Sequence, residues 1–109
     1  MPMPMPMPRG AVIAAGLLLF ASAQVLAEPP AVMQRYACSA CHQLDVRAVG
    51  PSWREIAARY RDGSKGTGQL VQSIRQGSRG QWGVVPMPPQ AQAREEDLQA
   101  ITQWILEQR

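Results

Sequence analysis

Apolar side chains recur every three or four residues along positions 28–109, which is the period of an amphipathic helix. Four stretches show this pattern, and the chain lacks the runs of β-branched and aromatic residues that favour strands. Their apolar faces are Val32, Met33 and Tyr36; Trp53, Ile56, Ala57 and Tyr60; Leu70, Val71 and Ile74; and Leu98, Ile101, Trp104 and Ile105. The sequence therefore predicts an all-α domain of about four short helices.

Prolines place the starts of the first two helices. The first is predicted to begin at Pro29 or Pro30 and to continue as far as Cys38. The second is predicted to open at Pro51, because the missing N–H of a proline costs nothing in the first turn of a helix.

Glycines and charges delimit the rest of the chain. Residues 43–50 and 62–68 are predicted loops, and the third helix is predicted to stop at Gly77. The prolines of residues 77–92 forbid a regular helix or a central strand there, and connections of this length are usually functional. The last helix is predicted to start near Arg94, with three acidic residues in its first turn.

Residues 1–27 have the features of a cleavable secretory signal peptide. After a Met-Pro repeat, Arg9 supplies a positive charge, and residues 11–23 form an apolar run that ends in small residues. Residues 21–23 and 25–27 both fit the small-x-small cleavage rule, and we expect cleavage after Ala27. An uncleaved anchor is the minor alternative, since the run is shorter than the ~20 residues of a spanning helix.

Size and charge limit what the mature domain, residues 28–109, can do. Its 82 residues form one small domain, and a core of that size usually needs added stabilisation, which a covalently held cofactor would supply. Ten basic residues remain against eight acidic ones once Arg9 is removed, and no basic run with interleaved aromatics is present. We therefore expect no nucleic-acid partner and no membrane span in the mature protein, which we expect to be a monomer.

The candidate chemistry lies in Cys38-Ser39-Ala40-Cys41-His42. This spacing is typical of c-type haem attachment, in which Cys38 and Cys41 form thioethers and His42 is the proximal iron ligand. A redox dithiol would favour a βαβ context, and a zinc site needs four ligands, whereas the chain has two cysteines and one histidine. A disulfide is also possible, but it gives His42 no role. One haem c is the predicted cofactor, attached outside the cytoplasmic membrane.

The sixth ligand must come from elsewhere, because His42 is the only histidine. Met33 stands five residues before Cys38, on the side of the attachment helix, and is predicted to be a core residue. Met87 stands between prolines that restrict the backbone and lower the entropy cost of presenting its side chain. Met87 is the predicted second axial ligand, although an isolated methionine is more often a filler of apolar gaps.

Two further residues are candidates for contacts around the haem. The Pro51 carbonyl is a possible acceptor for the second ring N–H of His42, and Pro51 also suits a helix start. The Trp82 indole N–H is a possible donor to a haem propionate, the alternative being a core or rim tryptophan.

These residues together resemble the small bacterial class I monohaem cytochromes c, most closely the cytochrome c-551 group. The likeness rests on the attachment motif, on Val49-Gly50-Pro51, on Trp82-Gly83 and on Pro86-Met87-Pro88-Pro89, in the order of that family. It implies a class I cytochrome c fold, ligation by His42 and Met87, a Pro51 acceptor for His42 and a Trp82 bond to a propionate. It also implies a periplasmic electron carrier between a bc1-type donor and a terminal oxidase or nitrite reductase.

The chain departs from the family pattern at two positions. Ser73 stands where the family often has a basic residue near a propionate, and Gln90 stands where an asparagine often bonds the methionine sulfur. The predicted mechanism is outer-sphere transfer of one electron, with partners docking beside Ala40 and Arg47. The alternatives are a haem enzyme or gas sensor with an open sixth site, a subunit of a membrane oxidase or reductase, and a haem-free dithiol protein.

Overall fold

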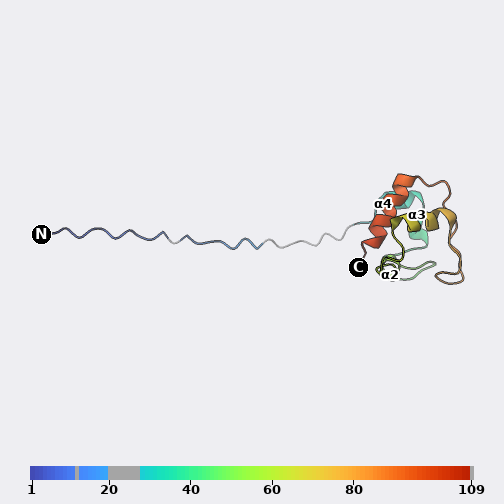
Figure 1. The fold of residues 1–109 in the computed structure, drawn as a ribbon, viewed down its shortest axis with the longest axis horizontal. Coiled ribbons are helices and arrows are strands. Elements are labelled where there is room, and N and C mark those ends of the chain that lie inside the picture. Colours follow the sequence, from blue (N-terminus) through green and yellow to red (C-terminus); the bar gives the residue numbers. More distant parts are fainter. Residues whose placement is uncertain (12, 20–27, 109) are drawn as a thin grey trace.

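The computed structural model describes residues 1–11, 13–19 and 28–108. Residues 1–11 and 13–19 contain no helix or strand and extend away from the folded domain (Figure 1). Both candidate cleavage sites lie outside the described residues. In the described part of the chain, no helix is long and apolar enough to cross a membrane.

Four α-helices and one 3₁₀ turn make up the domain, and the described residues contain no strand, only two isolated bridges. The elements are α1 (Val32–Arg35), η1 (Cys38–Ala40), α2 (Trp53–Arg59), α3 (Thr67–Gln76) and α4 (Glu95–Leu106). The prediction of an all-α domain with about four short helices is confirmed. The three acidic residues of the first turn of α4 are also where the sequence predicted them.

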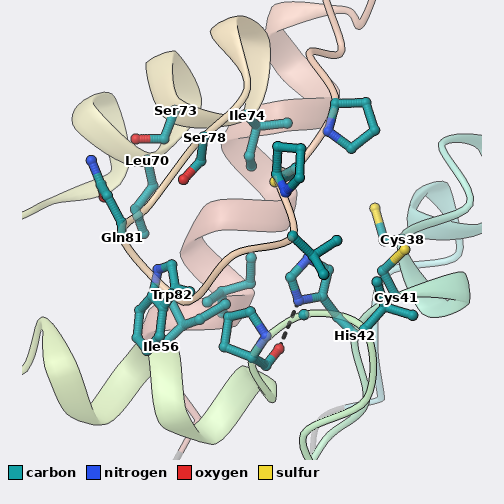
Figure 2. Close-up of a pocket in the computed structure, with 18 of the residues that line it drawn as sticks. Cys38, Cys41, His42, Ile56, Leu70, Ser73, Ile74, Ser78, Gln81 and Trp82 are labelled. Carbon is teal, nitrogen blue, oxygen red and sulfur yellow. Dashed lines mark hydrogen bonds between the residues drawn. The ribbon is translucent and has the colours of Figure 1, made fainter.

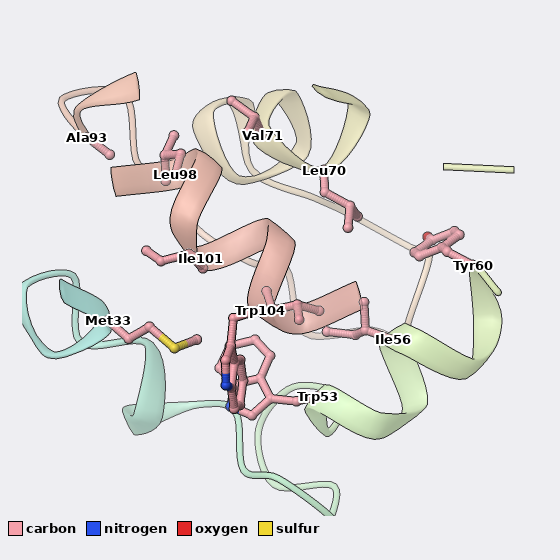
Figure 3. Packing of buried hydrophobic residues seen from close by; sticks show 11 residues of the cluster. Met33, Trp53, Ile56, Tyr60, Leu70, Val71, Ala93, Leu98, Ile101 and Trp104 are labelled. Atoms are coloured by element: carbon pink, nitrogen blue, oxygen red, sulfur yellow. The ribbon is translucent and has the colours of Figure 1, made fainter. Parts of the chain in front are cut away.

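Helix α4 lies at the centre of the core and contacts α1, α2 and α3 (Figure 3). Its buried face contains Leu98, Ile101, Trp104 and Ile105, as the spacing predicted, and also Thr102. Each fully buried Leu or Ile contributes about 1.5–3 kcal/mol by leaving water. Trp104 meets Trp53 of α2 edge to face, with ring centroids 6.1 Å apart. Packing against α4 therefore holds together helices that are each too short to be stable alone.

The first helix is shorter than predicted. It ends at Arg35, Ala37 adopts a left-handed conformation with φ of 53°, and the separate 3₁₀ turn then carries Cys38. The prediction of one helix running to the cysteines is wrong. The Tyr36 hydroxyl at this break donates to Asp97 at 2.6 Å, and Arg35 pairs with the same carboxylate at 3.0 Å. These contacts tie the break to the first turn of α4.

Helix α2 begins two residues later than predicted. Ser52 is its N-cap, and a reciprocal pair of hydrogen bonds between Ser52 and Glu55 satisfies two N–H groups at the helix start. The prediction that Pro51 opens this helix is wrong. Because Pro51 lies before the N-cap, its carbonyl is not used by the helix and can accept a hydrogen bond from a side chain.

The connection of residues 77–92 contains no helix, as predicted, and its two ends are fastened together. Ser78 and Met87 exchange backbone hydrogen bonds of 3.1 and 2.8 Å, and Gln90 N–H donates to the carbonyl of Ile74 in α3. Gly77 ends α3 with φ of 79°, and a Cβ there would lie 2.7 Å from the Met87 carbonyl oxygen. Glycine is therefore required for this close approach.

Candidate functional site

One cavity of about 690 Å³ lies between η1, α2, α3, α4 and the connection of residues 77–92 (Figure 2). Its volume falls in the range of about 300–1,000 Å³ that is typical of cofactor and ligand sites. Protein interiors are otherwise close-packed, so a hollow of this volume in a small domain indicates a binding site rather than a packing defect. All six residues singled out from the sequence line it: Cys38, Cys41, His42, Pro51, Trp82 and Met87.

His42 is held in one orientation. It is 8% exposed, and its Nδ1 lies 2.7 Å from the Pro51 carbonyl oxygen (Figure 2). A carbonyl only accepts, so Nδ1 is the donor in this bond and Nε2 is the ring nitrogen that points away from Pro51. The Trp53 indole stacks on the imidazole, with centroids 4.5 Å apart and planes 25° apart. The bond to Pro51 and the stacked indole therefore orient the His42 ring so that Nε2 is the nitrogen available to a metal.

Backbone contacts of residues 50–53 fix this arrangement. Gly50 N–H donates to the Cys41 carbonyl at 2.9 Å, and Trp53 N–H donates to the Gln43 carbonyl at 2.8 Å. A Cβ on Gly50 would lie 2.7 Å from His42 Cε1, so the absence of a side chain lets this segment close on the ring. The segment thus contacts the imidazole through a backbone edge, a carbonyl and an indole ring.

Cys38 and Cys41 are both free thiols and lie together at one side of the cavity, where Cys38 begins the 3₁₀ turn and Cys41 directly follows it (Figure 2). Burial raises the pKa of the Cys38 thiol, against a smaller opposing effect of a backbone hydrogen bond. Reactive dithiols have lowered pKa values, so this environment disfavours a redox dithiol. No group of three metal-binding side chains exists among the described residues, which disfavours a structural zinc site.

The two methionines of residues 28–109, Met33 and Met87, have different surroundings. Met33 is 4% exposed and belongs to the core cluster, as predicted. Met87 is half-buried and lines the cavity from the connection of residues 77–92. The bridge to Ser78 holds the Met87 backbone in place. The structure thus places a thioether side chain and an imidazole on the same cavity.

Trp82 is half-buried and held by two arginines. The Arg59 guanidinium carbon lies 4.2 Å from the centroid of the indole, and Arg59 Nη1 donates to the Gln81 carbonyl at 2.7 Å. Arg47 Nη1 donates to the Trp82 carbonyl, also at 2.7 Å. Sequence reasoning missed this role of Arg59, and also the stacking of Trp53 on His42. Only the predicted helical face of Trp53 pointed toward the interior.

The two positions that depart from the family pattern also line the cavity. The Ser73 hydroxyl donates to the Gln69 carbonyl of its own helix at 3.1 Å. Gln90 is half-buried, and its backbone N–H donates to the Ile74 carbonyl. Ser73 and Gln90 thus both lie beside the site, and each is fastened to a backbone carbonyl of α3, Ser73 through its hydroxyl and Gln90 through its backbone N–H.

The chain is similar to known proteins over nearly all of this domain. The family model described as cytochrome c oxidase, cbb3-type, subunit III matches residues 24–105. The chain belongs to this cytochrome c family. It is 34% identical to cytochrome c-551 of Pseudomonas aeruginosa over 98 residues, which cover 90% of this chain and 92% of the relative. It is 37% identical to cytochrome c-552 of Nitrosomonas europaea over 97 residues, covering 89% and 91%.

The crystal structure of wild-type Nitrosomonas europaea cytochrome c552 superposes on the present chain with a TM-score of 0.68, and the two sequences are 37% identical. The overlap covers 72% of this chain and 96% of that structure. The small class I cytochrome c fold is thereby confirmed. The cytochrome is an electron-transfer protein, not an enzyme, and its cofactor is one covalently bound haem c. The free thiols, the oriented imidazole and the cavity fit that group.

Proposed function

We propose that the cytochrome is a monomeric periplasmic carrier that transfers single electrons through a haem ligated by His42 and Met87. Cys38 and Cys41 form the thioether bonds of attachment. The haem supplies an iron that alternates between the ferric and ferrous states. A thioether paired with an imidazole raises the reduction potential relative to ligation by two histidines, and two bound side chains leave no position on the iron for a substrate.

The observation that carries this proposal is the orientation of His42. Its Nδ1 lies 2.7 Å from the Pro51 carbonyl oxygen and donates to it, which leaves Nε2 as the nitrogen available to iron. Pro51 therefore sets both the tautomer and the ring orientation, and its bond increases the basicity of the ligand. A histidine that served only the core would have no need of a cavity beside it, or of two cysteines at this spacing.

Met87 completes the ligand set in this proposal. The Ser78 bridge and the flanking Pro86 and Pro88 restrict its backbone, so little entropy is lost when the sulfur binds. Trp82 donates its indole N–H to a haem propionate, and the Arg59 contact on its ring supports that orientation.

Export through a signal peptide of residues 1–27 places the carrier in the periplasm, where we infer a bc1-type donor and a terminal oxidase or nitrite reductase as acceptor. The matching family model is described as a subunit of an oxidase. The alignments with the two relatives named above instead cover 92% and 91% of those small cytochromes. Because the likeness extends over nearly the whole of each relative, we infer a separate small carrier rather than an oxidase subunit. Its redox partners are expected to form small, transient complexes with it.

The test is Met87→Ala in holoprotein matured in the periplasm, with Met33→Leu as the matched control. Met87→Ala is expected to lower the reduction potential, abolish the ferric charge-transfer band of methionine–iron ligation, and allow binding of carbon monoxide by the ferrous protein. Met33→Leu is expected to keep all three properties, because Met33 is a core residue that volume-conserving substitution alters little. A Met87→Ala protein with wild-type potential and no response to carbon monoxide would exclude this ligand assignment.

A further inference from the structure

The two ends of the cavity differ in chemistry. Cys38 and Cys41 lie at one end, whereas Ser73, Gln81 and Trp82 lie at the other (Figure 2). The vinyl-derived edge of a haem, where thioethers form, is opposite the edge that carries its two propionates. Attachment at the cysteines therefore directs the propionates to the end formed by Ser73, Gln81 and Trp82.

Two carboxylates at that end require positive charge or donors, because burying an unpaired charge is costly. Arg47 and Lys65 are the only basic residues that line the cavity in the part of the chain that the structure describes. Arg47 is already engaged, since it donates to the Trp82 carbonyl and its Nε lies 3.7 Å from Glu55. Arg47 is therefore already shared between a backbone carbonyl and a carboxylate of the protein.

Lys65 has the opposite character. Its Nζ donates to Gln81 Oε1 at 3.2 Å. Because Gln81 directly precedes Trp82, this bond places the ammonium at the propionate end of the cavity. It also lies 5.3 Å from the centroid of the Tyr60 ring, on the wall of the cavity. No carboxylate of the described residues forms an ion pair with it. An ammonium in this place has donors and charge to offer to a ligand.

We propose that Lys65, the only lysine of the chain, binds a haem propionate and so takes the place of the basic residue that Ser73 does not provide. Gln81 holds the ammonium in position, and Lys65 and the Trp82 indole approach the carboxylate edge from neighbouring positions. A cation here favours the ferrous state, because it offsets the negative charge that would otherwise stabilise ferric iron. This inference rests on the proposed attachment through Cys38 and Cys41.

The experiment compares Lys65→Gln, Lys65→Arg and Arg61→Gln in the holoprotein. Arg61 is the matched control because it is an exposed cation four residues away that does not line the cavity. Reduction potentials are measured at low and high ionic strength, and the propionate methylene resonances are followed by NMR. Lys65→Gln is expected to lower the potential more than Arg61→Gln does and to keep most of that shift in high salt, which screens exposed charges. Lys65→Arg is expected to restore the wild-type potential.

The outcomes separate this inference from the proposed function. Equal shifts for Lys65→Gln and Arg61→Gln, or propionate resonances that do not move in Lys65→Gln, would overturn the role of Lys65 alone. A wild-type protein without covalently bound haem, judged by its optical spectrum after denaturation in acid acetone, would overturn the attachment on which both rest. Shifted resonances in Lys65→Gln only, with rescue by arginine, would support the direct contact.

Discussion

Gly50→Ala adds one methyl group against the ring of His42. The new Cβ would lie 2.7 Å from Cε1, about 0.7 Å inside the 3.4 Å at which ordinary contact begins. Gly50 does not have a positive φ, so the substitution introduces no backbone strain and its effect is steric alone. Either the ring or the segment of residues 50–51 must move, and both are parts of the bond between His42 and Pro51.

The cost follows from that overlap. Overpacking a closed site costs about 1–3 kcal/mol, and weakening the hydrogen bond between His42 and Pro51 adds about 1 kcal/mol. For a domain of this size, a loss of about 2 kcal/mol lowers Tm by roughly 10 °C. The reduction potential is expected to rise as well, because a less basic imidazole stabilises ferric iron less.

Thermal unfolding of the holoprotein, followed by circular dichroism, measures this loss. Gly68→Ala is the matched control, since it adds the same methyl group in α3 with no atom within 4 Å. It is expected to stabilise the protein by about 0.5–1 kcal/mol, because alanine is the better helix former. The reasoning fails if Gly50→Ala unfolds at the wild-type temperature with an unchanged potential while Gly68→Ala behaves as expected.

Two further changes test the packing and the electrostatics. Trp53→Ala removes the stacking on His42 and the edge contact with Trp104, and is expected to lower the free energy of unfolding in urea by about 3–5 kcal/mol. Trp53→Phe keeps an aromatic ring and should lower it clearly less. Equal losses of stability in the two variants would refute the importance of the stack. Hydrogen bonds from Ser64 lower the pKa of Asp62 below its usual 3.8. The ionised carboxylate therefore stabilises the folded state above pH 3.8, and this contribution to stability disappears as the pH falls through the lowered pKa. Asp62→Asn is expected to reduce the dependence of stability on pH below 4, and an identical pH profile would contradict it.

Burial was the part of the fold most readily predicted from the sequence. The stripes of α2 and α4 are buried as predicted, because helical spacing directly encodes which side chains share a face. The attachment motif and the methionine connection were also readable, since their chemistry depends on spacing within short segments. The cavity brings both together, although no local pattern states that they meet.

The boundaries of the first two helices were predicted less well, for two different reasons. At the end of α1, Ala37 has a positive φ that no property of alanine favours, so the break is imposed by contacts such as that between Tyr36 and Asp97. At the start of α2, the signal was present, because Ser52 and Glu55 have the spacing of a capping box. Pro51 competes with that signal, because proline also suits the first position of a helix. The hydrogen bonds of Ser52 and Glu55 decide the helix start in the structure.

Contacts between distant segments could not be predicted at all. Arg59 reaches the Gln81 carbonyl across 22 positions, and Arg47 reaches the Trp82 carbonyl across 35. Nothing in the neighbourhood of either arginine distinguishes it from a solvated surface residue. Such roles depend on how the connection of residues 77–92 folds back over α2, which only the tertiary structure defines.

The bridge between Ser78 and Met87 has a consequence for how this protein can diverge. It closes the connection at its base, so residues 79–86 form an outer arc whose ends are already joined. Val84 and Val85 on that arc are 96% and 58% exposed. Substitutions or insertions at Val84 and Val85 need not displace Met87, because loop length adds little to the cost of a closure that is already made, whereas Gln81 and Trp82 of the same arc line the cavity and are held by contacts with α2. The exposed surface of this arc can therefore change in sequence during evolution while the backbone position of Met87 is kept.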